Sequence, residues 1–325
     1  MSTPWIIGSA LFVLWVLIKS KKSRPDGTLV RNLHPYRQIM QYVMPTRVES
    51  TCYYDVGVRA ERIEAYVARA REKFGANMTH CVVAGAYLAL AGIPDLNRFV
   101  VGRRLYQRDG VWISFSMKRQ KRNREAKLSV VKLRMEEGES FEGLVARIND
   151  KIGHERSGKK TYADKEYDLF NLLPRPVLRM ATAFLKWLDF NNLLPGSFIH
   201  PDSLYTSMVI ANLGSLDMSA AYHHLYEWGN ASFFLMVGAV EDRAIIENGV
   251  PVAARILPIR VSFDERIEEG LSCLKGIEFF EKMMLDPERY LGCLEDDGSD
   301  TRPMWPQPTQ EQVTSTADEN VTPGL

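Results

Sequence analysis

Cysteine is scarce in this sequence, and its few copies lie far apart. None of the 4 cysteines among the 325 residues belongs to a Cys-x-x-Cys pair. This spacing excludes a zinc ribbon and argues against a disulfide framework, so we expect reduced thiols. The positions are Cys52, Cys81, Cys273 and Cys293.

An excess of one charge is also missing. The 41 basic and 40 acidic residues leave a net charge of +1, so nothing indicates nucleic acid as a partner. The sequence has no glycine-rich phosphate loop and no internal repeat. Four of the six histidines lack cysteine or carboxylate partners at metal-ligand spacing, so we expect no metal site. These four are His34, His80, His154 and His200.

The amino terminus contains the one long apolar run. Pro4–Ile18 carries no charge, and the basic cluster Lys19–Arg24 follows at once. A cleaved signal peptide would place its positive charge before the apolar run. Residues 1–20 are therefore predicted to form a single-pass membrane anchor, with the folded domain on the cytoplasmic side by the positive-inside rule. The alternative is a buried or interfacial helix.

The rest of the chain divides into three parts by composition. Residues 21–32 read as a polar linker, and residues 33–295 form the folded domain. Residues 296–325 read as a disordered tail, because their distal part is rich in proline, threonine, glutamine and glutamate.

Helical and strand patterns alternate within residues 33–295. Mixed strands with helices packed on them predict an α/β fold, in the form of a two-layer α+β sandwich. Thr79 is the expected N-cap of an apolar helix over 81–91, and Ser140 that of a helix over 141–152. Residues 103–106 and 111–117 are expected to pair as a hairpin around Gly110. Further helices are expected over 59–74, 174–190 and 267–284, and further strands over 48–58, 206–212, 232–240 and 253–263.

Five segments, in order, resemble the catalytic domain of the 2-oxoacid dehydrogenase acyltransferases, whose fold is that of chloramphenicol acetyltransferase. Each match is short, but together they cover about 260 residues. Ser262–Gly270 resembles the family's Phe-Asp-His-Arg-x-x-Asp-Gly motif, and Val209–Gly214 its Ile-Ser-Asn-Leu-Gly strand. The remaining matches are an entry helix in Tyr36–Glu49, Pro-x-Leu-Asn within Ile93–Asn97, and Asn-Pro-Glu at Asp286–Glu288.

The resemblance implies a thioester chemistry whose two main groups are replaced here. In the family, the motif histidine is the general base toward a thiol, and the strand serine stabilises the oxyanion, at a site between two subunits of a trimer. Glu265 stands at the histidine position and Ala211 at the serine position. Asp264, Arg266 and Gly270 match the motif, and Glu269 replaces its last aspartate.

A second set of polar residues offers a relocated site. His223 and His224 lie in an aromatic segment about ten residues after the altered strand. One hypothesis is that either histidine replaces the lost base, with Glu265 orienting it or the acceptor, and with the Asn212 amide as a further polar group. The alternative is that both histidines pack and hydrogen-bond structurally at a subunit contact. Neighbours in an extended segment face opposite ways, so at most one of the two could point inward.

Two functions remain open from the sequence. The first is a membrane-anchored acyltransferase that uses a thioester such as acyl-coenzyme A and an unknown acceptor. The second is an inactive relative that serves as a trimeric scaffold or binding module. The expected partners are the membrane and further copies of the chain, with no bound cofactor. No lipoyl domain precedes the catalytic region, which argues against a role in 2-oxoacid oxidation.

Overall fold

The computed structural model describes residues 3–118, 128–157, 168 and 170–304. A mixed sheet forms its centre, with strands in the order β6-β5-β7-β8-β10-β2. Strand β9 pairs with the amino-terminal half of β10. The β5–β7 and β7–β8 pairs are parallel, and the other pairs in this sheet are antiparallel. The predicted α/β class is confirmed. The strands are β2 Thr51–Arg59, β5 Trp112–Lys118, β6 Leu128–Arg134, β7 Met208–Asn212, β8 Phe233–Val237, β9 Glu241–Glu247 and β10 Val250–Asp264.

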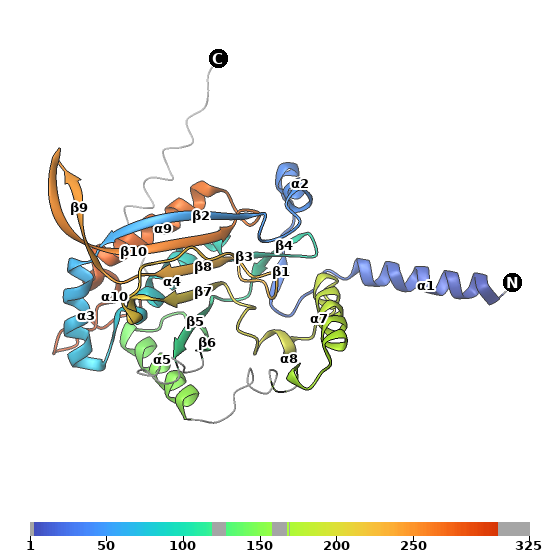
Figure 1. Ribbon diagram of the computed structural model, residues 1–325, viewed down its shortest axis with the longest axis horizontal. Coiled ribbons are helices and arrows are strands. Elements are labelled where there is room, and N and C mark those ends of the chain that lie inside the picture. The colour runs from blue at the N-terminus through green and yellow to red at the C-terminus, as the bar shows by residue number, and fades with distance from the viewer. Residues whose placement is uncertain (1–2, 119–127, 158–167, 169, 305–325) are drawn as a thin grey trace, which may run out of the picture.

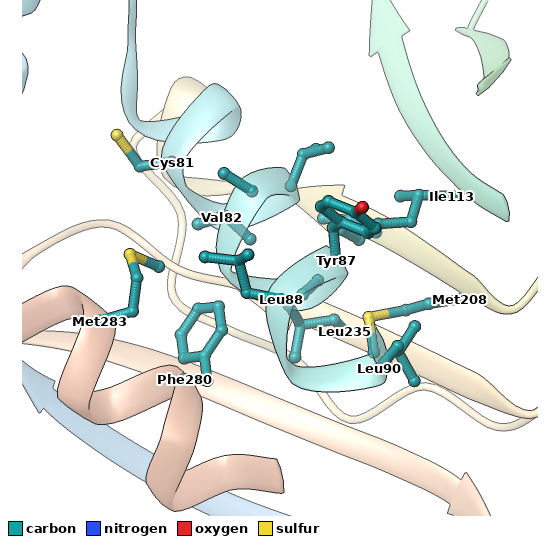
Figure 2. Packing of buried hydrophobic residues seen from close by; sticks show 14 of the residues in the cluster. Cys81, Val82, Tyr87, Leu88, Leu90, Ile113, Met208, Leu235, Phe280 and Met283 are labelled. Carbon is teal, nitrogen blue, oxygen red and sulfur yellow. The ribbon is translucent and has the colours of Figure 1, made fainter. Parts of the chain in front are cut away.

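Helices cover one face of this sheet, and the main core lies between the two layers. Apolar side chains of α4 meet those of β5, β7, β8 and α9 there, as Figure 2 shows. Because α4 is apolar on every side, almost all of it is buried. The helices are α1 Thr3–Ser20, α2 Pro35–Val43, α3 Glu61–Phe74, α4 Met78–Gly92, α5 Phe141–Arg156, α7 Arg175–Phe190, α8 Gly196–Ile199, α9 Gly270–Leu285 and α10 Pro287–Leu291, with short 3-10 turns η1 Pro94–Leu96 and η2 Gly214–Leu216.

A second, smaller sheet shows that the predicted hairpin is wrong. Strand β4 (Arg104–Arg108) pairs with β1 (Gly27–Leu29) and β3 (Arg98–Val101), whereas β5 pairs with β6 and β7. The chain changes sheets at the turn that contains Gly110, whose φ is +72°. A turn glycine between two β-rich runs is common to a hairpin and to such a crossing, so the pattern alone does not separate them.

The helix starts were predicted with mixed success. Ser140 caps α5, since its side chain accepts a hydrogen bond from the Gly143 N–H. The N-cap of α4 is Asn77 and not Thr79, because the Asn77 side chain accepts from the Thr79 N–H and His80 returns the reciprocal bond of a capping box. The Thr79 hydroxyl takes no part in this cap and instead accepts a hydrogen bond from the Asn212 amide.

Helix α1 extends away from the body of the molecule (Figure 1). Its apolar side chains are exposed, with Phe12 63% and Leu17 61% accessible. Among the described residues, no single helix combines the length and hydropathy needed to cross a bilayer, and Ile7–Ser20 is a shorter apolar stretch. The finding gives no support to the predicted single-pass span.

The segment predicted as a linker is packed against the domain at the base of α1. Arg24 is buried, and its guanidinium pairs with Asp26 (2.9 Å) and with Asp189 at the end of α7 (3.0 Å). Arg24 also donates to the Asn192 side chain at 3.1 Å. We call this set of residues the Arg24 network. It fixes residues 24–26 against α7, and β1 follows directly.

The domain also continues past residue 295. The Asp300 carboxylate accepts hydrogen bonds from the N–H groups of Leu294 and Glu295, and Met304 is buried. Residues 296–304 therefore pack on the body, while the predicted disordered tail beyond them lies outside the described residues.

Candidate functional site

The sheet face opposite the helices carries the candidate site. Residue alternation places Val209, Ala211, Phe234 and Met236 on this face, and segment 213–231 covers them. Within that segment, residues Tyr222–Gly229 form what we call the histidine loop. Ser262 of β10 anchors this loop, because its hydroxyl donates to the His223 carbonyl oxygen at 2.5 Å.

The two histidine rings lie on the same side of the loop. The His223 ring stacks on Phe234 with a centroid distance of 4.0 Å, and the His224 ring stacks on His223 at 5.0 Å. The expectation that adjacent histidines must face opposite ways is therefore wrong, because the backbone is not a regular strand here. His223 is half-buried and His224 is exposed.

Backbone carbonyls determine which ring nitrogens carry the proton. His223 Nδ1 lies 2.6 Å from the His224 carbonyl oxygen, and His224 Nδ1 lies 2.8 Å from the Leu225 carbonyl oxygen. A carbonyl only accepts, so in the neutral state each Nδ1 must be the N–H donor and each Nε2 keeps its lone pair. The Tyr226 hydroxyl lies 3.4 Å from His223 Nε2. His224 Nε2 has no hydrogen-bond partner among the described residues.

The turn after β10 is built around a buried ion pair. Arg266 pairs with Asp264 through two hydrogen bonds of 2.8 and 2.7 Å, and both residues are buried. The other terminal nitrogen of Arg266 donates to the Met44 carbonyl oxygen at 2.9 Å. These two residues thus hold the turn against the segment that precedes β2.

Glu265 occupies an exposed position in this turn. Its N–H donates to the Ser50 carbonyl oxygen at 3.0 Å, whereas its carboxylate makes no hydrogen bond or ion pair within the described part of the chain. Burial, together with the Glu265 charge, raises the pKa of the nearby Cys52 thiol. The carboxylate is thus available to a ligand or to a neighbouring chain.

A second acid of the motif with firm contacts is one that the sequence did not single out. Glu268 pairs with Arg98 at 2.8 Å and with Arg37 at 3.2 Å, while the Glu269 side chain is 68% exposed. Gly270 begins α9, and a Cβ there would lie 3.1 Å from the Tyr54 hydroxyl. Spacing to the motif glycine favoured Glu269, and only the fold shows that Arg98 reaches Glu268.

The altered strand offers little polar chemistry of its own. Ala211 is 9% exposed and packs with Phe234 and Met236. The Asn212 amide donates to the Thr79 hydroxyl at 2.9 Å, and its oxygen accepts from the Ser215 N–H at 3.2 Å. Asn212 therefore joins β7 to α4 and to the turn that follows.

Glu265 and Ala211 do not meet within one chain. Ala211 pairs with Met236, which pairs with Arg260, and Glu265 follows five residues later. Five strand residues span roughly 17 Å. His223 is closer to the motif, since it is anchored at Ser262. A site that uses both replaced positions would need two subunits.

Comparison with known structures identifies the fold. A probable dihydrolipoamide acetyltransferase from Listeria monocytogenes is similar with a TM-score of 0.54 at 15% identity, covering 85% of this chain and 99% of that chain. The cubic core of the pyruvate dehydrogenase multienzyme complex gives 0.51 at 14% identity, covering 83% and 93%. A catalytic core of the 2-oxoacid dehydrogenase multienzyme complex from Thermoplasma acidophilum gives 0.50 at 15%, covering 80% and 99%.

The comparisons of sequence alone give a different result. No protein-family model matches the chain, and no curated protein matches it. The resemblance predicted from the five motifs is thus confirmed at the level of the fold: the chain has the architecture of the 2-oxoacid dehydrogenase acyltransferase catalytic domains.

Proposed function

We propose that this protein is an acyltransferase that takes its acyl group from a thioester such as acyl-coenzyme A and uses His224 as the general base. The observation that carries the proposal is the arrangement of the histidine loop. The Nδ1 atom of His224 is held by a backbone carbonyl, and its Nε2 lone pair is exposed. This is the tautomer and orientation that a base needs.

The proposed reaction needs only this base and the two substrates. His224 Nε2 takes the proton of the acceptor nucleophile, which attacks the thioester carbonyl carbon. The tetrahedral intermediate then collapses, the carbon–sulfur bond breaks, and the leaving thiolate receives the proton from the imidazolium. Glu265 would face the same ligand from a neighbouring subunit, as the resemblance to trimeric relatives implies.

The competing function is a scaffold without turnover. It is favoured by Ala211, which is packed among apolar side chains, and by Asn212, whose amide is already bonded on both sides. Ala211 has no side-chain donor for an oxyanion, and one of the two amide hydrogens of Asn212 is already given to Thr79. Losing such a donor costs about 10²–10³ in rate, so the proposed enzyme would be slow unless another donor replaces it.

Thiol release from acyl-coenzyme A tests the choice between these functions. Detergent-solubilised protein is incubated with acetyl- and decanoyl-coenzyme A together with candidate acceptor thiols and alcohols, and free coenzyme A is followed with a thiol reagent. We expect His224→Ala to lower the rate by about 10²–10⁴. His223→Ala should have a smaller effect, because that ring is stacked on Phe234.

A matched control is available on α5. His154 is exposed and remote from the loop, so His154→Ala should leave the rate unchanged. Equal rates in the wild type and in both loop variants would rule out the base assignment. The absence of saturable binding of either thioester would favour the scaffold.

We further propose that the protein acts at a membrane as a homotrimer. Exposed apolar residues of α1 and the adjacent Lys19, Lys21 and Lys22 support attachment to a bilayer with anionic lipids. We place the folded domain on the cytoplasmic side, by the charge order noted above. The fold it shares with a structure described as a cubic core supports assembly.

A further inference from the structure

A cleft of about 420 Å³ opens beside α7, and its lining includes neither the two loop histidines nor Glu265. Its walls come from the last turns of α7, the β3–β4 turn, the segment before β2 and the end of the histidine loop. We call it the α7 cleft. Volumes of this size are typical of small-molecule sites.

The α7 cleft contains a buried cation that no carboxylate neutralises directly. Arg47 lines the cleft and is only 8% exposed. Its guanidinium donates one hydrogen bond, to the Val100 carbonyl oxygen at 3.1 Å, and makes no ion pair among the described residues. Burial lowers the pKa of this guanidinium, because a charge is costly to desolvate without a partner.

The other cleft charges are mostly satisfied within the protein. Arg266 is paired with Asp264, and Asp189 is paired with Arg24. Glu227 accepts the Val48 N–H at 3.0 Å and is the one carboxylate of the lining without an ion pair among the described residues. The rim adds two further cations, Lys186 and Arg103, both exposed. The unpaired charge that a ligand would meet is therefore predominantly positive.

The remaining lining is largely apolar. Val101, Leu185, Phe190 and Trp228 line the cleft from separate parts of the chain. A ligand that satisfies both features has a hydrocarbon chain and an acceptor oxygen at one end. Arg47 would donate to that oxygen, and the apolar walls would cover the chain.

The position of the cleft links it to α1 and to the candidate site. Phe190 lies beneath the Lys19 ammonium at 5.4 Å, and Arg104, next to the cleft residue Arg103, donates to the Lys19 carbonyl oxygen at 2.7 Å. Figure 1 shows α7 beside the carboxyl end of α1, so the cleft lies near the base of that helix. Glu227 and Arg266 connect it to the histidine loop and to the motif turn.

We propose that the α7 cleft binds a fatty acyl chain, with Arg47 donating to its carboxylate or thioester carbonyl oxygen. The inference builds on the proposed function, since it names the acyl group that the enzyme would transfer. It also gives a reason for the cleft's place at the base of the apolar helix, because fatty acyl groups partition into membranes.

Equilibrium binding titrations test the fatty acyl site without requiring that the protein transfer an acyl group. The full-length protein, solubilised in detergent, is titrated with decanoate, with decanoyl-coenzyme A and with 1-decanol, which has the chain but no carbonyl. We expect Arg47→Met to weaken binding of decanoate by tenfold or more and to leave 1-decanol within about twofold. Leu185→Trp, which fills the cleft, should weaken all three.

Controls and contrary outcomes are defined by the same titrations. Arg71→Met removes an exposed arginine on α3 and should bind as the wild type does. Decanoate binding that is not saturable, or that Arg47→Met leaves unchanged, would overturn the inference. An equal loss for decanoate and 1-decanol in Arg47→Met would do the same, because it would indicate a structural role.

Stronger binding of decanoyl-coenzyme A than of decanoate identifies the thioester as the source. Loss of thiol release with decanoate binding intact would count against the proposed function alone.

Discussion

His80 shows how burial of one ring makes the stability of the domain depend on pH. It is 1% exposed, and its Nδ1 accepts the Asn77 N–H at 3.0 Å as part of the α4 capping box. Burial lowers its pKa to about 4. The folded protein thus keeps the ring neutral over a range in which the unfolded chain, with a pKa near 6.5, takes up a proton.

The neutral His80 ring therefore makes the folded protein less stable as the pH falls. As the pH falls from about 6.5 to 4, the unfolded state gains the proton first, and the free energy of unfolding falls by up to about 3 kcal/mol from this group. His80→Gln keeps an acceptor for the capping box and removes the titration. We expect urea denaturation from pH 7 to 4 to give a shallower loss of stability in this variant.

A control at an exposed site isolates the contribution. His154→Gln should keep the wild-type pH dependence, because His154 is exposed on α5. Parallel curves for the wild type and His80→Gln would contradict the assignment.

Helices α1 and α7 both leave apolar side chains uncovered at one end of the molecule. In α7, no residue is buried, and Met180 and Phe184 are 72% and 58% exposed. Trp187 stacks on Phe184 within this face. These exposures leave the apolar face of α7 outside the core, and we propose that it contacts lipid.

If α1 attaches the protein to a bilayer, acidic substitutions in its apolar part should prevent binding to liposomes. We expect the wild type to float with liposomes of phosphatidylcholine and phosphatidylglycerol, and the double substitution Leu11→Glu and Leu14→Glu to abolish flotation. Each acidic side chain would have to leave water to enter the bilayer. Ile246→Glu, at an exposed apolar position on the β9–β10 arm, is the matched control and should float normally. Flotation of the double variant would refute attachment by α1.

At the scale of the whole molecule, assembly is the property that decides whether the two replaced positions ever meet. Glu265 follows the carboxyl end of β10 and Ala211 lies near the carboxyl end of β7, and these strands run in opposite directions. The two residues therefore lie toward opposite ends of the sheet in one chain, so only a neighbouring subunit can bring one to the other. Exposed aromatic residues on the outer sheet face, Tyr53 and Tyr222, offer a surface for such a contact.

The assembly is measured by light scattering coupled to size-exclusion chromatography in mild detergent. A chain of 37.0 kDa predicts a trimer of about three times that mass, near 111 kDa after the detergent contribution is subtracted. A protein mass near 37.0 kDa at micromolar concentration would contradict the trimer.

The fold was predictable because the resemblance rests on segments that the architecture itself requires. The motif turn joins β10 to α9, and the Asn-Leu-Gly strand is the central β7. Pairing between distant parts of the chain was not predictable in the same way. Strand β4 pairs with β1 and β3 in the small sheet and not with β5. The local pattern around Gly110 carries no information about those partners.

The candidate site was predictable in its residues and less so in their geometry. The sequence identified Glu265, Ala211 and the two histidines, but their roles depend on contacts between distant segments. Asn212 is held by Thr79 across 133 positions, and Glu268 by Arg98 across 170. The direction of the histidine rings follows from Phe234 and from local carbonyls, which periodicity does not reveal.

The Arg24 network has a mechanical consequence. Its ion pairs and hydrogen bonds hold the first residues after α1 against α7 and the small sheet. No flexible linker therefore separates α1 from the domain. In the proposed membrane-attached state, the domain would therefore keep a fixed orientation toward the bilayer. The proposed site would then stay at a constant distance from the lipid surface, which favours acceptors that are themselves membrane-bound.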